Sequence, residues 1–110
     1  MKKSPRSSPK PPKAYKAFIK RFPALAQSWE SISAAGRKGP LDEKSVRLVK
    51  FALAVGAQQE GAAHSSVRKA AAMGISRAEL EQVVALAAGT IGMPRVVASW
   101  CWVNDELGAD

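Results

Sequence analysis

Glu60 and His64 are the two residues whose types and spacing could do chemistry in this sequence. They lie four positions apart, so a helix would place the carboxylate and the imidazole on one face. His64 is the only histidine in the chain, and the face continues through the apolar residues Val67 and Ala71. Imidazole exchanges protons near neutral pH, and a neighbouring carboxylate fixes its tautomer. The pair is therefore a candidate proton-transfer site. The alternative is a satisfied polar contact in a helical interface.

Cysteine and histidine usage predicts no metal and no other cofactor. Cys101 is the only cysteine, so neither a disulfide within the chain nor a cysteine-based zinc site can form. A single histidine likewise argues against a zinc or iron site. We expect Cys101 to be a small buried apolar residue, and its solitary thiol fits a reducing compartment.

The positive charge is concentrated at the start of the chain. Residues 1–22 hold eight basic and no acidic side chains, a net charge of +8, whereas residues 23–110 hold nine of each. Residues 1–12 contain four of the seven prolines and predict a disordered basic tail. Contact with nucleic acid is an alternative role for this tail, because lysine clusters bind phosphate without a fold.

No apolar run approaches the length of about 18 residues that suggests a membrane span. No apolar segment follows the basic start either, so a secretory signal is not indicated. We expect a soluble, cytoplasmic protein.

Apolar residues recur at helical spacing throughout residues 13–110, and no segment alternates with period two. Asp42 is a candidate N-cap, and the residues from Ser76 to Glu79 form a capping box. Gly74 suits the position after a helix end. The pattern predicts one all-α domain with about six helices, near residues 13–22, 23–36, 43–55, 60–73, 77–91 and 94–107.

Alanine is frequent in these helices, so each buries little apolar area and the core should be thin. Three tryptophans, Trp29, Trp100 and Trp102, are more than such a core can enclose. Aromatic residues are enriched at interfaces, so we predict a homo-oligomer. The alternative places Trp29 and Trp100 in the core and leaves Trp102 half exposed.

The order of features from Leu41 to about residue 103 resembles the carboxymuconolactone decarboxylase family, which includes the alkyl hydroperoxidase D-like proteins. The resemblance rests on LDEKSVRLVKFALAVG, on the helix with Glu60 and His64, and on AAAMGISRAELEQVVALAAGTIGMPRVVASW. Its most specific part runs from His64 through A-x-x-x-G-I-S-x-x-E-L to G-x-P. The family implies an all-α, alkyl hydroperoxidase D-like fold that assembles into trimers or hexamers.

The resemblance supports one of the family's two chemistries and excludes the other. The peroxidase-linked branch uses C-x-x-C followed by histidine, and those cysteine positions fall on Ala57 and Glu60. Dithiol chemistry needs two thiols, so this route is excluded. The decarboxylase branch has an acid one turn before its histidine, as Glu60 and His64 do. Arg68 or Arg95 could hold a substrate carboxylate. Arg47 departs from the family, which commonly has glutamate there.

These observations predict cofactor-independent proton transfer on a small organic acid or lactone, using Glu60 and His64. One alternative is a non-catalytic oligomeric family member that serves as an assembly or binding module. Another is a family-level antioxidant, peroxiredoxin-type role by a different route. The expected partners are other copies of the chain and a small acid or lactone, with nucleic acid reached only through the basic tail.

Overall fold

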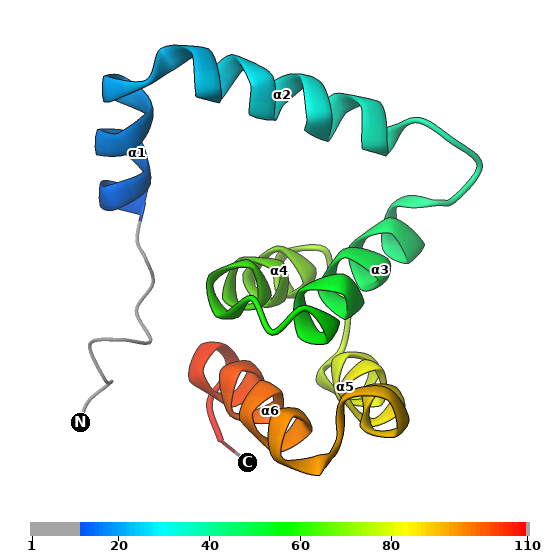
Figure 1. The fold of residues 1–110 in the computed structure, drawn as a ribbon. Helices are drawn as coiled ribbons and strands as arrows, with labels where there is room; N and C mark the ends of the chain where they lie inside the picture. Colours follow the sequence, from blue (N-terminus) through cyan, green and yellow to red (C-terminus); the bar gives the residue numbers. More distant parts are fainter. Residues whose placement is uncertain (1–11, 110) are drawn as a thin grey trace. The chain divides into compact units, whose positions relative to one another are not determined.

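The computed structural model describes residues 12–109, and within them it contains six α-helices and no strand (Figure 1). This confirms the all-α prediction. Residues 1–11 of the predicted tail lie outside the described residues, while Pro12 begins the first helix. The helices are α1 (Pro12–Arg21), α2 (Pro23–Arg37), α3 (Glu43–Gly56), α4 (Glu60–Ala72), α5 (Arg77–Ile91) and α6 (Met93–Leu107).

The chain divides into two compact units between Leu41 and Asp42. The first unit contains α1 and α2, which contact each other. Pro23 occupies the first turn of α2, where its missing N–H leaves no hydrogen bond unmade. No residue of α2 is buried, although the helix is amphipathic as predicted.

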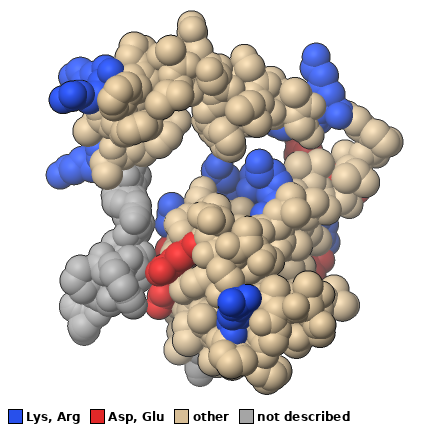
Figure 2. Space-filling model, in the orientation of Figure 1, with Lys and Arg blue, Asp and Glu red and all other residues tan. Residues whose placement is uncertain are grey.

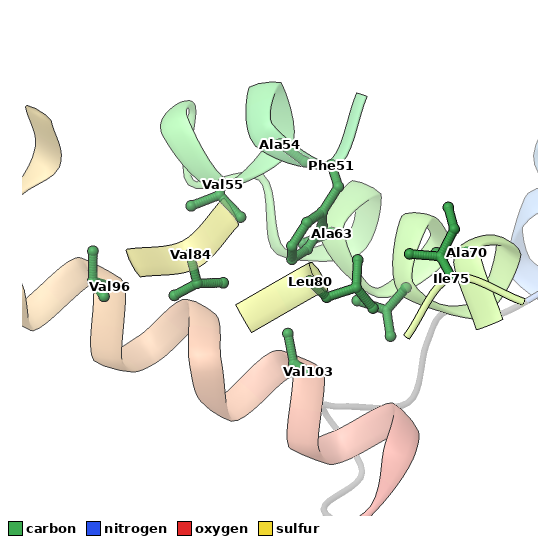
Figure 3. Packing of buried hydrophobic residues seen from close by; sticks show 11 residues of the cluster. Phe51, Ala54, Val55, Ala63, Ala70, Ile75, Leu80, Val84, Val96 and Val103 are labelled. Atoms are coloured by element: carbon green, nitrogen blue, oxygen red, sulfur yellow. The ribbon is translucent and has the colours of Figure 1, made fainter. Parts of the chain in front are cut away.

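The second unit contains α3 to α6, and its core is built from small and medium apolar side chains. α3 packs against α4 and α5, and α6 packs against the same two helices. In Figure 3 the side chains of Phe51, Leu80 and Val103 point toward one another from three helices. The buried apolar residues are Phe51, Ala54, Val55, Ala63, Val67, Ala70, Ile75, Leu80, Val84, Val96 and Val103.

Local signals determine the helix ends of this unit. The Asp42 carboxylate accepts a hydrogen bond from the Ser45 N–H at 2.8 Å and caps α3. Ser76 and Glu79 form both hydrogen bonds of the predicted capping box at the start of α5. Gly74 follows α4 with φ of +85°, a conformation that glycine adopts without strain. These three predictions are confirmed.

Because of Glu79, the folding stability of this unit should change with pH in the acidic range. A hydrogen-bonded ion pair with Lys44, followed by the Ser76 backbone N–H, lowers the pKa of Glu79 from 4.5 to about 2. A depressed carboxyl pKa stabilises the folded state above the unfolded pKa, and this contribution is lost as the pH falls through the folded pKa. Urea denaturation should show that Glu79→Gln unfolds at lower urea than wild type at pH 7. The difference should shrink between pH 4.5 and 2.

Glu43→Gln is the matched control, because Glu43 is an acidic residue in the first turn of α3, as Glu79 is in α5. A difference between Glu79→Gln and wild type that stayed constant across this pH range would contradict the role of the carboxylate charge.

Three side chains are more exposed than a place in the core would allow. Trp29 and Trp100 are 48% and 43% exposed, so the alternative that placed them in the core is wrong. Trp102 is partly buried, as that alternative expected. Cys101 is exposed, and its predicted burial is also wrong. The reason is helical geometry: α6 turns Ser99 and Val103 toward the core, and a residue midway between them faces away.

No helix within residues 12–109 has both the length and the apolar character required to cross a bilayer.

Candidate functional site

The turn before α4 determines where Glu60 and His64 lie. Gln58 has φ of +54°, which is uncommon for a residue other than glycine. Its side-chain amide donates to the Val55 carbonyl at 2.9 Å and to the Ser99 hydroxyl of α6 at 3.0 Å. The hydrogen bond to Ser99 holds the turn against α6. Glu60 then begins α4, and His64 follows one turn later.

The imidazole of His64 lies between carboxylates from two helices. Its side chain is only 3% exposed. Nδ1 lies 2.7 Å from Oε2 of Glu106 on α6, and Nε2 lies 3.4 Å from Oε2 of Glu60 on its own helix. Oδ2 of Asp105 lies 3.7 Å from the same Nε2. Both ring nitrogens therefore face acidic groups.

This arrangement determines which nitrogen carries a proton. An ionised carboxylate only accepts hydrogen bonds, so the short contact with Glu106 requires Nδ1 to donate. Nε2 and Glu60 can then share one further proton, either as imidazolium with carboxylate or as neutral imidazole with carboxylic acid. Because Glu60 is 41% exposed and His64 is buried, the proton on Glu60 is the one that a molecule from solvent can reach.

Arg68 also contacts one of the carboxylates around His64. Its Nη1 donates to Oε2 of Glu106 at 3.0 Å, so the same oxygen receives hydrogen bonds from His64 and Arg68. Glu106 is 14% exposed, whereas Arg68 is 45% exposed. Glu106 is thus fixed from two sides, and the guanidinium of Arg68 remains open to solvent.

Figure 2 shows acidic side chains gathered where the start of α4 lies beside the end of α6. Asp105 and Glu106 were not identified from the sequence, because they lie more than 40 residues from His64. One signal could have found them. Two acidic residues in the last turn of a helix interact unfavourably with its macrodipole. They are therefore expected to have a cationic partner elsewhere.

The structure does not bring Arg95 to His64 within one chain. Arg95 is exposed near the start of α6, eleven residues before Glu106, which is about 16 Å along a helix. Arg47 lies beside a different face of α4, where its Nη1 donates to the Ser66 hydroxyl at 3.2 Å. Burial lowers the pKa of Arg47.

Two grooves lie elsewhere on this unit. One, of about 410 Å³, lies between α3 and α5 and includes Leu48, Val83 and Leu86. The other, of about 440 Å³, lies between α5 and α6 beside Trp100. Neither groove includes Glu60 or His64. Within residues 12–109, no group of three or more His, Cys, Asp or Glu side chains is arranged to hold a metal ion.

Comparison with known proteins places this chain in a family. The carboxymuconolactone decarboxylase family model matches residues 23–105, a range that runs from α2 to near the end of α6. No curated protein and no solved structure gives a significant match. The matched range contains Glu60, His64, Arg68 and Arg95, and it covers well over half of the chain. The chain therefore belongs to the carboxymuconolactone decarboxylase family.

Proposed function

We propose that this protein catalyses cofactor-independent proton transfer on a small organic acid or lactone, in the manner of a carboxy-lyase. The observation that carries the proposal is the buried imidazole of His64, which lies between Glu60 and Glu106. A buried imidazole in contact with a more exposed carboxylate is an arrangement that suits proton transfer. Family membership supports the same class of chemistry.

The geometry suggests a division of roles. Glu60 is the more exposed acid, so it delivers the proton to the substrate. His64 stands behind it and returns a proton to Glu60 through Nε2, while Glu106 holds Nδ1 and keeps the ring in one orientation. Arg68 is exposed beside this group and can bind the carboxylate of an acidic substrate.

The proposed step balances with water as the only other reactant. The bond between the substrate carbon and its carboxylate breaks, and carbon dioxide leaves. The electron pair that remains is delocalised toward the lactone carbonyl, and the carbon then takes the proton from Glu60. Water restores the proton to the Glu60–His64 pair.

The test is release of carbon dioxide from carboxymuconolactone by wild type and by His64→Ala. We expect turnover by wild type and a large loss of turnover in the variant. The variant lacks the imidazole that returns a proton to Glu60. Circular dichroism of both proteins verifies that the variant is folded. Equal turnover in both proteins would contradict the role of His64.

A second candidate is a non-catalytic assembly module, favoured by the apolar surface. Leu86 in the groove between α3 and α5 is 71% exposed, and neither of the two grooves reaches His64. Ala57 and Glu60 stand where the peroxidase-linked branch has its cysteines, so an antioxidant role would need a different route. Absence of turnover by an assembled wild-type protein would favour the assembly module.

Both candidates predict self-association into a trimer or hexamer. Light scattering on the purified protein should give three or six times the chain mass of 11.7 kDa. Leu86→Lys should reduce that mass, because it places a charge in the apolar groove between α3 and α5. Leu53→Lys is the matched control, since Leu53 is 66% exposed but does not line this groove.

A monomeric wild-type protein would contradict the predicted assembly. An equal loss of mass in both leucine variants would show that the groove is not the contact surface.

Cytoplasmic location and nucleic-acid contact through the basic tail stay predictions. Residues 1–11 of that tail lie outside the described residues.

A further inference from the structure

Four basic side chains gather across α3 and α4, and one of them, Arg68, also pairs with Glu106 beside His64. Arg47 and Lys50 lie three residues apart on α3, and Arg68 and Lys69 are consecutive on α4. The hydrogen bond from Arg47 Nη1 to the Ser66 hydroxyl, at 3.2 Å, joins the two helices at this point. Basic side chains are seen together on the edge of the unit where α3 and α4 lie in Figure 2.

The positive charges of Arg47, Lys50 and Arg68 act on Lys69. Burial is the main cause that lowers the pKa of Lys69, and the positive charges of Arg47, Lys50 and Arg68 lower it further. Like charges repel, so this concentration of cations is unfavourable in the absence of an anion.

Carboxylates of the described residues compensate only part of this charge. Arg68 pairs with Glu106 at 3.0 Å. Among the ion pairs within residues 12–109, none includes Arg47 or Lys69. In addition, Nε of Arg47 is buried without a hydrogen-bond partner among the described residues. Buried donors are rarely left without an acceptor, so an acceptor from outside this part of the chain is indicated.

We propose that Arg47 and Lys69 form a binding site for a small, doubly charged oxyanion of the phosphate type. Such an anion supplies acceptor oxygens to the guanidinium and places negative charge among the four cations. The buried Ser66 hydroxyl accepts from Arg47 Nη1 and holds the guanidinium at this place. The site is separate from the proton-transfer group, because His64 and Glu60 face α6 whereas Ser66 contacts α3. It does not depend on the proposed catalytic activity.

The experiment is a titration of the full-length protein with inorganic phosphate, followed by the ¹⁵N–¹H resonances of the arginine Nε–H groups. Arg47→Lys identifies the Arg47 resonance by removing it while keeping the positive charge. We expect the Arg47 resonance to shift in a saturable manner. Lys69→Gln should raise the dissociation constant at least about tenfold, whereas Arg95→Gln, at the exposed start of α6, should leave it unchanged.

Acetate at matched ionic strength is the second arm. It carries a single charge, so it should bind at least about tenfold more weakly than phosphate. Equal affinity for acetate and phosphate would overturn the proposed preference for a doubly charged anion. A linear shift of all arginine resonances, or an affinity that Lys69→Gln leaves unchanged, would show nonspecific attraction to the basic chain and would overturn the site itself.

Discussion

Glu60→Gln should slow the release of carbon dioxide from carboxymuconolactone by about 10²- to 10⁴-fold, the usual contribution of a positioned general acid. Glutamine keeps the size of the side chain but has no acidic proton to transfer. The amide can still contact Nε2 of His64, from which Oε2 of Glu60 lies at 3.4 Å. We therefore expect the fold to survive while the chemical step fails. Steady-state kinetics would show the loss in kcat.

Glu43→Gln is the matched control for this prediction as well. Glu43 and Glu60 are both acidic residues in the first turn of a helix, on α3 and α4 respectively. The control should retain full turnover. A change in KM alone in Glu60→Gln would mean that Glu60 binds substrate without transferring the proton.

Phe51→Ala should lower the free energy of unfolding by about 3–5 kcal/mol, the usual range for removing a buried phenylalanine. Phe51 is fully buried and is the largest side chain of the core. Its neighbours in that core include Ala54 and Ala63, whose small side chains cannot expand into the space left behind. Urea denaturation followed by circular dichroism measures the difference.

Leu53→Ala serves as the control, because Leu53 lies on the same helix and is 66% exposed. Its effect should stay within about 0.5 kcal/mol, as for most surface substitutions. Equal destabilisation by the two variants would contradict the described core of the second unit. Measurements at several protein concentrations separate folding from assembly.

Signals within a few residues made the helices predictable. The cap at Asp42 involves a residue three positions away, and so does the capping box between Ser76 and Glu79. Gly74 marks a helix end through its own backbone conformation. Such features are encoded locally, so no knowledge of the packing is needed to recognise them.

The tertiary partners of His64 could not be predicted in the same way. Glu60 is visible from the sequence because it lies one helical turn away, whereas Glu106 reaches the ring only because α6 packs against α4. The exposure of Trp100 and Cys101 also depends on how α6 is rotated about its axis relative to the core. Helical periodicity does not determine this rotation, because α6 has apolar residues on several sides. Arg95 was a candidate for binding a substrate carboxylate only because of its positive charge.

The most direct test of the proton-transfer site is the ¹⁵N NMR spectrum of the imidazole, which is unambiguous because His64 is the only histidine. Nδ1 lies 2.7 Å from Oε2 of Glu106, so we predict that the neutral ring carries its proton on Nδ1 and that this proton is protected from exchange. Nε2, which lies 3.4 Å from Oε2 of Glu60, is then the nitrogen without a proton in the neutral ring. A neutral imidazole that carries its proton on Nε2 and leaves Nδ1 bare would contradict the account.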